Sequence, residues 1–260
     1  MRITLIGSGN VATHLGAALK NAGHQIVQVY SRHAQNAALL AYHIKAEPTN
    51  DLQQISADTD LFIISVSDDA IDELAAVLAV HGKPIVHTSG ATALKVLLKY
   101  TDQAGVFYPL QTFSKIKEVD FWQVPMCIEA AYEDLTIELQ QLAQTISNNV
   151  SLVNSDQRKA LHLAAVFACN FPNYLYYAAQ QLLAGHDLDF NLIRPLIIET
   201  AQKVEFQMPA DVQTGPAVRG DHNTMTAHLA MLQTEPQLKE IYTLLSQAII
   251  KMAEGKHRVE

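Results

Sequence analysis

The first half of the chain alternates between short hydrophobic runs and segments whose hydrophobic residues recur at helical spacing. The spacing predicts helices from Val11 to Ala22, after Ser67, and between residues 130 and 150, and Ser67 stands where it can cap the second helix. This alternation predicts a doubly wound α/β sheet with right-handed crossovers. The predicted strands are 3–6, 25–30, 60–66, 84–88, 105–108 and 126–129.

Beyond Asn154 the sequence contains no convincing strand, and three or four long helical segments follow. Ser155 is predicted to cap the first of these helices, which continues to Ala184. Pro172 removes one of its internal hydrogen bonds, so we expect a kink near residues 168–171.

The change of pattern predicts two domains, an α/β domain over residues 1–153 and an all-helical domain over residues 154–260. The long helix contains a stretch, Leu163 to Cys169, that is apolar on every side, which predicts burial on every side. A helical domain of about 100 residues has little material with which to surround such a helix. We therefore expect a homodimer built on the C-terminal helices.

Composition narrows the class of protein. The chain has 260 residues, 49% of them hydrophobic and 17% charged, which excludes a disordered chain. A net charge of −8 without a basic block disfavours nucleic-acid binding. Two distant cysteines, Cys127 and Cys169, provide neither a zinc spacing nor a disulfide framework. The N-terminal apolar run is too short for a signal peptide, and polar residues interrupt the apolar stretch 161–184, so we expect a cytoplasmic protein with no membrane partner.

The first predicted strand ends in a glycine-rich turn. Residues 7–12 read Gly-Ser-Gly-Asn-Val-Ala and fit the G-x-G-x-x-G/A pattern, directly after a strand and at the start of a helix. In such a turn Gly7 permits a tight bend, Gly9 lets backbone N–H groups approach a pyrophosphate, and Ala12 keeps the helix close to the sheet. The alternative is a plain strand–turn–helix with chance glycines. The context favours a dinucleotide site formed by Gly7, Ser8, Gly9, Asn10 and Val11.

The end of the second strand bears on the choice between NAD and NADP. An NAD site usually has an acidic residue there, but this chain reads Tyr30-Ser31-Arg32-His33. Arg32 can pair with a 2′-phosphate and Ser31 can donate a hydrogen bond to it, which favours NADP(H). The alternative is that Arg32 is a solvent-exposed residue at the start of a loop.

Two later strand ends carry small polar residues. Val66 and Ser67 follow one strand, and Thr88 and Ser89 follow the next. Ligands of open α/β sheets bind beyond the carboxyl ends of the strands, so these four residues are predicted to line the nicotinamide and its ribose. Structural roles are also open, because Ser67 can act as a helix cap and Gly90 as a turn residue.

Three further segments extend the pattern along the chain. They are 87–90 (His-Thr-Ser-Gly), 105–113 (Gly-Val-Phe-Tyr-Pro-Leu-Gln-Thr-Phe) and 214–221 (Thr-Gly-Pro-Ala-Val-Arg-Gly-Asp). Together with the glycine turn, the Tyr-Ser-Arg strand end and the helical second half, they resemble the 6-phosphogluconate dehydrogenase-like superfamily, which includes the pyrroline-5-carboxylate reductases and the β-hydroxyacid dehydrogenases. More closely, the chain resembles the NADP oxidoreductase family in which a DUF2520 helical domain follows a Rossmann-like domain. The resemblance implies a nucleotide and a dimer more firmly than any substrate.

The second domain departs from the β-hydroxyacid dehydrogenases, which place a lysine and an asparagine one turn apart on the helix that faces the nicotinamide. Here the comparable helix carries Lys159, His162, Asn170 and Asn173 at spacings that put them on one helical face. Such a polar face needs partners or a wet pocket. A pocket against the sheet edge and hydrogen bonds between helices across a dimer are both open.

A bend at 215–221 precedes another helix. Its Arg219 can hold a carboxylate or phosphate, or can instead pair internally with Asp221. A metal at Asp221, His222 and His228 is disfavoured, because six residues place the two histidines on different faces of a helix.

These features predict an NADP(H)-dependent oxidoreductase that transfers a hydride to or from a small polar C=O or C=N compound, carboxylates included. Asn170, Asn173 and Arg219 are the candidate substrate contacts. An NADP(H)-binding sensor or scaffold without turnover is the alternative function. The candidate proton donors, in order of preference, are His162, Lys159, His87 and Tyr108.

Overall fold

The computed structural model describes residues 1–114 and 116–256. The chain divides into two compact units, Met1–Asn170 and Phe171–Glu260. We describe each unit on its own.

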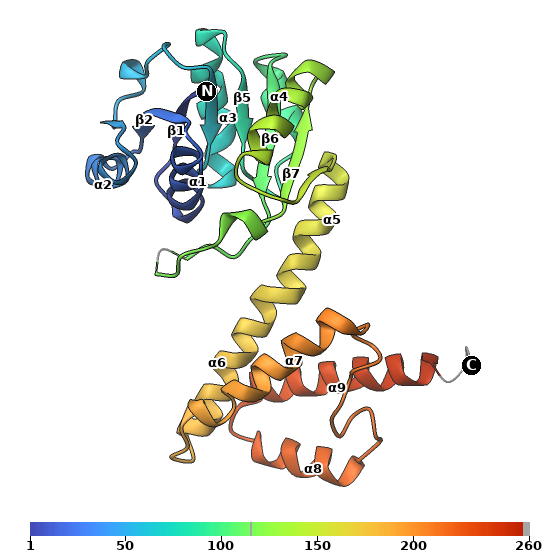
Figure 1. Cartoon of the computed structure of the whole chain (residues 1–260). Helices are drawn as coiled ribbons and strands as arrows, with labels where there is room; N and C mark the ends of the chain where they lie inside the picture. The colour runs from blue at the N-terminus through green and yellow to red at the C-terminus, as the bar shows by residue number, and fades with distance from the viewer. Residues whose placement is uncertain (115, 257–260) are drawn as a thin grey trace. The chain divides into compact units, whose positions relative to one another are not determined.

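The first unit is built on an eight-stranded sheet with the order β3-β2-β1-β4-β5-β6-β7-β8 (Figure 1). Neighbouring strands are parallel except β6 and β7, which pair antiparallel. The predicted doubly wound α/β architecture is therefore confirmed. The strands are β1 (Arg2–Ile6), β2 (Gln25–Tyr30), β3 (Glu47–Thr49), β4 (Leu61–Ile64), β5 (Ile85–His87), β6 (Ala104–Pro109), β7 (Met126–Ala130) and β8 (Val150–Leu152).

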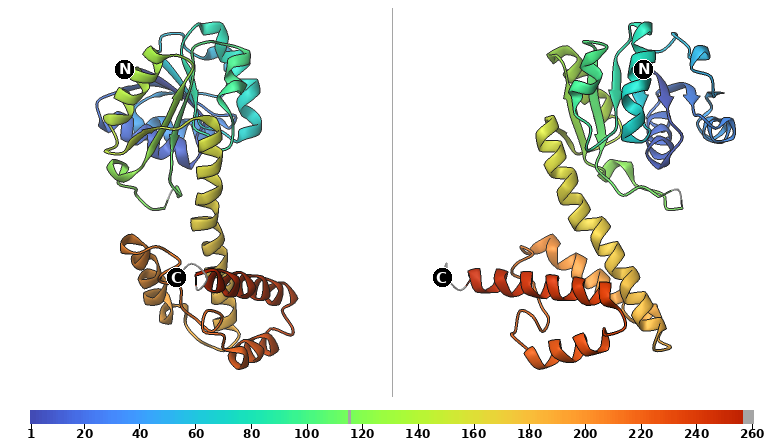
Figure 2. Two further views of the ribbon diagram at one scale, coloured as in Figure 1. Left: turned by 90° about the vertical axis from the view of Figure 1, so that its right-hand side faces the viewer. Right: turned by 180° about the vertical axis from the view of Figure 1, so that it is seen from behind.

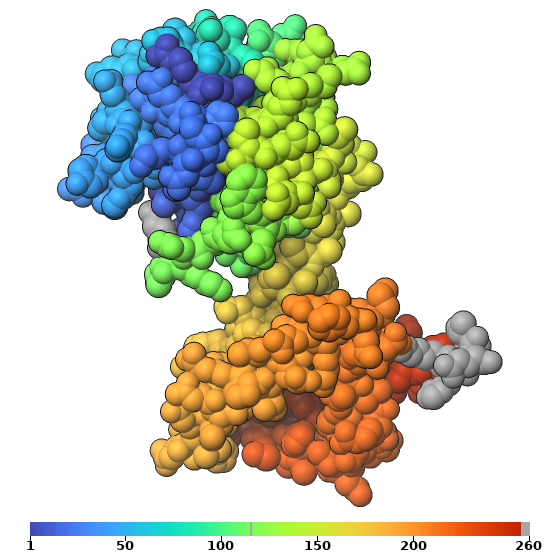
Figure 3. Space-filling view, in the orientation of Figure 1, coloured from blue at the N-terminus to red at the C-terminus, as the bar shows by residue number. Residues whose placement is uncertain are grey.

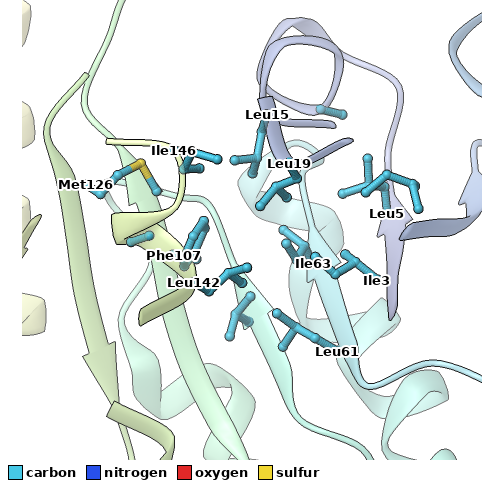
Figure 4. Close-up of a cluster of buried hydrophobic side chains, with 14 of the residues drawn as sticks. Ile3, Leu5, Leu15, Leu19, Leu61, Ile63, Phe107, Met126, Leu142 and Ile146 are labelled. Carbon is cyan, nitrogen blue, oxygen red and sulfur yellow. The ribbon is translucent and has the colours of Figure 1, made fainter. Parts of the chain in front are cut away.

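Helices cover both faces of this sheet (Figure 2). They are α1 (Asn10–Asn21), α2 (Ala34–Ile44), α3 (Ile71–Leu78) and α4 (Glu133–Gln144). Alternate residues of one strand pack into two different cores: Ile63 of β4 belongs to the cluster beneath α1 and α4, and Ile64 to the cluster beneath α3. Figure 4 shows Ile63 in the first cluster, between the strands and α1. A strand that is apolar on both faces is what a covered parallel sheet requires.

Two helix caps differ from the sequence prediction. Ser67 makes no capping hydrogen bond, because a 3₁₀ turn (Asp68–Ala70) separates it from α3. The cap of α5 (Ser155–Ala165) is Asn154, whose side-chain oxygen accepts hydrogen bonds from the backbone N–H groups of Asp156 and Gln157 at 3.1 and 2.9 Å. Ser155 instead directs its hydroxyl to the Glu129 carboxylate, 2.8 Å away.

The long helix reaches Ala184 as predicted, but it is not a uniform α-helix. A π-helical turn (Val166–Asn170) joins α5 to α6 (Phe171–Ala184). This turn lies directly before Pro172, whose missing N–H removes one bond of the α-helical ladder. Where the sequence predicts a kink near residues 168–171, the structure has this change of hydrogen-bonding pattern.

The second unit is helical in its described part, as predicted. It comprises α6, α7 (Arg194–Phe206), α8 (His222–Met231) and α9 (Pro236–Lys256), with a short 3₁₀ turn (Phe190–Leu192) before α7. Many of its large apolar side chains are exposed in the single chain; Phe206 retains 84% of its accessible surface and Leu244 67%. Among the described residues, no helix has both the length and the hydropathy required to cross a membrane.

Candidate functional site

A cavity of about 640 Å³ opens at the carboxyl ends of β1, β2, β4, β5 and β6, entirely within the first unit. This is the edge at which an open α/β sheet binds its ligands. All of the residues predicted to bind a cofactor line it: Gly7, Ser8, Gly9, Asn10, Val11, Ser31, Arg32, Val66, Ser67, Thr88 and Ser89.

The glycine turn has the geometry that a dinucleotide needs. Gly7 has a φ of 128°, and a Cβ there would lie 2.1 Å from the Ser65 carbonyl oxygen, so any side chain at this position would collide with backbone. A Cβ at Gly9 would meet nothing within 4 Å, which leaves open space beside the start of α1. Ala12 is fully buried between α1 and the sheet. A pyrophosphate fits the free N–H groups at this helix terminus.

The end of β2 offers a cation and no carboxylate. Arg32, His33 and Asn36 line the cavity at the start of α2, and the Ser8 hydroxyl donates a hydrogen bond to Ser31 Oγ at 2.8 Å. His33 occupies the N-cap position of α2 without capping it through its side chain. A guanidinium at this position can pair with a phosphate group.

A segment between β6 and β7 lies against α1, beside the glycine turn, as the green and blue surfaces of Figure 3 show. The Asn10 side chain donates a hydrogen bond to the Phe113 carbonyl at 2.9 Å, and the His14 ring stacks on Phe113. The start of α1 is therefore tied to a segment about 100 residues away in the sequence.

Two of the four candidate proton donors meet in the cavity. The Tyr108 hydroxyl lies 3.2 Å from His162 Nδ1, and both residues line the cavity wall. Burial is the main cause that raises the pKa of Tyr108 to about 12, so its phenol is protonated near neutral pH and can donate to Nδ1. When Nδ1 accepts that bond, the neutral His162 ring carries its single N–H proton on Nε2.

Gly90 packs against the rings of His162 and Tyr108. A Cβ at Gly90 would lie 2.7 Å from His162 Nδ1 and 2.9 Å from Tyr108 Cζ. The loop after β5 therefore packs its backbone directly against both rings, which only a residue without a side chain allows.

The other two candidate donors, Lys159 and His87, do not line this cavity. The Lys159 ammonium lies 3.7 Å from the Asp156 carboxylate on an exposed turn and does not line the cavity. His87 is fully buried behind the wall, where its Nδ1 accepts a hydrogen bond from the Ser89 N–H at 3.2 Å. Burial, followed by the charge of Arg158, lowers the pKa of His87 to about 3, so its ring is neutral and has no acidic proton to give at ordinary pH.

The candidate substrate residues lie elsewhere in their own units. Asn170 is exposed at the end of the π-helical turn and is not part of the cavity wall. Asn173 lines a separate hollow in the second unit, beside Tyr177 and Arg194. Arg219 is exposed in the loop before α8.

The loop before α8 is fixed by capping. The Asp221 carboxylate accepts hydrogen bonds from Thr224 Oγ1 at 2.7 Å and from the Thr224 N–H at 3.0 Å. These two bonds lower the pKa of Asp221, and the charges of Arg219 and His222 lower it further. Asp221 thus acts as the N-cap of α8.

Several residues that were not predicted from the sequence also line the cavity. Gln111, Asp68 and Glu73 add polar groups to the wall, and Leu52 and Leu74 add apolar surface. Arg158, likewise not predicted, is a fully buried cation whose hydrogen bonds hold the loop after β5. Its only signal in the sequence is a charged residue four positions before His162 on the same helical face.

Comparison with known proteins places this geometry in context. A Rossmann-like domain model matches residues 1–112, and the model of a domain of unknown function, DUF2520, matches residues 124–249. No protein of curated function matches the sequence at a significant level.

Several solved structures share the fold over the whole chain. A "putative NADP oxidoreductase" from Bacteroides fragilis is 44% identical, with 96% of this chain and 98% of that one covered and a TM-score of 0.91. A Thermotoga maritima protein is 22% identical, with coverages of 98% and 99% and a TM-score of 0.74. An imine reductase from Myxococcus stipitatus, solved with NADP⁺, is 14% identical, with coverages of 100% and 95% and a TM-score of 0.67.

Proposed function

Because the chain belongs to the NADP oxidoreductase family that joins a Rossmann-like domain to a DUF2520 domain, we propose that it is an NADP(H)-dependent oxidoreductase. Its substrate in this proposal is a small polar C=O or C=N compound. One observation carries the proposal: the dinucleotide-binding elements and the His162–Tyr108 pair line the same cavity.

Each part of the cavity has a binding task in this function. The turn from Gly7 to Val11 holds the pyrophosphate, and Ser31 and Arg32 hold the 2′-phosphate. Residues at the ends of β4 and β5 flank the nicotinamide and its ribose. When bound, the reduced cofactor supplies a hydride to the substrate carbon.

Reduction of C=O or C=N also consumes one proton, which the substrate oxygen or nitrogen receives. We assign its delivery to the imidazolium form of His162, because this ring lines the cavity and histidine is a common general acid. In that form the Nδ1–H donates to the Tyr108 oxygen, which orients the ring, and the Nε2–H gives up its proton to leave a neutral imidazole. Asn170, Asn173 and Arg219 are proposed as substrate contacts from their residue types alone, Arg219 for an anionic group.

The test is consumption of NADPH, followed at 340 nm, with a panel of 2-oxo acids, aldehydes and cyclic imines. We expect at least one class to be reduced by the wild-type protein and not by His162→Ala. Tight NADPH binding without turnover of any compound would favour the sensor or scaffold function. The position of Lys159 outside the cavity is the observation that keeps this alternative open, because the lysine-based chemistry of the β-hydroxyacid dehydrogenases then has no counterpart here.

We also propose that a second copy of this chain covers the exposed apolar side chains of the C-terminal helices. The stretch Leu163–Cys169, expected to be buried, is largely exposed in the single chain, with Leu163 retaining 59% of its surface. In the second unit, exposed apolar residues occur on α6, α7, α8 and α9. Surface so widely spread over one folded unit fits a large permanent interface of the kind that homodimers form. Light scattering at low micromolar concentration should give twice the mass of the single chain; a monomer would contradict the proposal.

A further inference from the structure

Arg158 is a cation with no exposed surface, held at the point where three segments of the first unit meet. Its Nε donates to the Ser89 carbonyl at 3.2 Å, and its Nη2 donates to the Thr92 carbonyl at 2.5 Å. Its Nη1 pairs with the Glu129 carboxylate of β7, also at 2.5 Å. One planar guanidinium therefore fixes the loop after β5, the strand β7 and its own helix α5.

The acceptors of Arg158 are themselves held in place. Ser155 Oγ donates to Glu129, accepts from the Leu94 N–H at 2.9 Å and lies 3.3 Å from Arg158 Nη2. The Ser89 hydroxyl accepts hydrogen bonds from the N–H groups of Ala91 and Thr92. The loop is therefore stabilised by its own hydrogen bonds at the same residues that Arg158 contacts, Ser89 and Thr92.

The two segments that Arg158 joins, helix α5 and the loop after β5, both contact the His162–Tyr108 pair. His162 lies four residues after Arg158 on α5, on the same face of the helix. Gly90 directly follows Ser89, and its backbone packs against His162 Nδ1 and Tyr108. Any shift of the Ser89 carbonyl relative to α5 therefore changes the space in which the two rings meet.

Stability alone does not explain a buried ion pair at this place. Well-packed apolar residues of similar size often serve a core as well or better, because two charges must be stripped of water. A guanidinium offers donors in fixed directions, which a lysine ammonium does not. The use of these donors on two backbone carbonyls and one carboxylate indicates a requirement for geometry.

We propose that Arg158 is a positioning residue, which sets the contact between His162 and Tyr108 by locking the Ser89–Thr92 loop to helix α5. The inference rests on the proposed function, in which that pair delivers the proton. Arg158 itself does not line the cavity and touches neither cofactor nor substrate in this role.

The decisive variant is Arg158→Lys, which keeps the positive charge but loses the fixed directions of the guanidinium N–H donors. In ¹⁵N-histidine spectra of the full-length protein, we expect the neutral His162 ring of the wild type to be mainly the Nε2–H tautomer. Arg158→Lys should shift it toward a mixture of tautomers, as Tyr108→Phe should. NADPH affinity should stay within about threefold, and kcat should fall about tenfold or more with little change in the KM for NADPH.

The control is Lys99→Met, which removes an exposed cation that pairs with Asp72 outside the cavity. It should change neither the His162 spectrum nor kcat. If Arg158→Lys does not fold, Gly90→Ala approaches the same contact from the loop side, because its Cβ would intrude between the two rings. Gly90→Ala should then produce the same tautomer change with Arg158 intact.

A folded Arg158→Lys protein with the wild-type His162 spectrum and wild-type kcat would overturn the inference. So would an unaltered spectrum in Gly90→Ala, where Arg158→Lys cannot be made. The two proposals fail separately: a wild-type protein that reduces no compound ends the proposed function, whereas the spectra still decide whether Arg158 positions the pair.

Discussion

The two units of this chain complete their cores in different ways. In the first unit, strand residues such as Phe62 and Phe107 have no exposed surface, because helices cover the sheet on both sides. In the described part of the second unit, few apolar residues are buried, Met225 and Leu232 among them, and Phe206 and Leu244 are mostly exposed. A sheet whose two faces are covered by helices buries its apolar residues within one chain, whereas the helices of the second unit keep apolar side chains exposed. The nucleotide cavity lies in the first unit.

The largest effect is expected at the cavity of the first unit. If this unit supplies the proton donor, His162→Ala should lower kcat by about 10²–10⁴ while NADPH affinity stays nearly unchanged. Steady-state kinetics and calorimetry measure the two quantities. A wild-type kcat in this variant would contradict the assignment of His162 as the proton donor.

Packing gives the next largest effect. Phe107→Ala should lower the free energy of unfolding by about 3–5 kcal/mol, because the ring fills a core that cannot collapse around the gap. Urea denaturation measures the loss. Phe206→Ala makes the same change in the second unit. A similar loss in the free energy of unfolding would indicate that a second chain covers Phe206. A change within about 0.5 kcal/mol would indicate that Phe206 is exposed to solvent.

Acid should weaken the first unit through His87. The pKa of His87 is about 3 in the folded protein, against 6.5 for the free side chain, so below pH 6.5 the unfolded state binds a proton that the native state does not. Stability from this group is therefore complete above pH 6.5 and falls as the pH drops toward 3. Between pH 6.5 and 5 the loss should be about 2 kcal/mol. His87→Asn should flatten the unfolding free energy over that range; an equally steep profile would contradict the assignment.

The smallest expected effect concerns the cofactor. NADPH should bind at least tenfold more tightly than NADH, a difference of about 1.4 kcal/mol, and Arg32→Asp should remove that preference. Calorimetry measures both affinities. Lys45→Asp, the same charge change at the opposite end of α2 and outside the cavity, is the control. Equal affinities for the two nucleotides in the wild type would contradict the role of Arg32.

The sequence predicts the sheet and the cofactor residues because their signals are local. A hydrophobic run followed by Gly-x-Gly and a helix constrains the backbone within a few residues of itself, and all of the predicted cofactor residues line the cavity. The strands β3 (Glu-Pro-Thr) and β8 (Val-Ser-Leu) contain no buried apolar run, unlike β5, which is equally short and was predicted. Asn154 and Ser155 are both good capping residues, and only the distant Glu129 decides between them.

The surroundings of the candidate proton donors leave no such local signal in the sequence. His87 and His162 are alike as residues, but one is buried by strands far away in the sequence and the other faces Tyr108. Arg158 holds the loop after β5, and its partners lie between 29 and 69 residues from it along the chain, apart from Ser155 on its own helix. Such contacts have no periodic signature, so a single sequence does not reveal them.

The π-helical turn before Pro172 changes how the long helix should be counted. A π turn takes up one residue more than an α turn, so side chains beyond it are rotated by about 100° from where an uninterrupted α-helix would carry them. In an uninterrupted α-helix, residues eight positions apart such as His162 and Asn170 point in directions that differ by about 80°. The π turn at Val166–Asn170 reduces that angular difference, so it brings Asn170 closer to the helical face that carries His162.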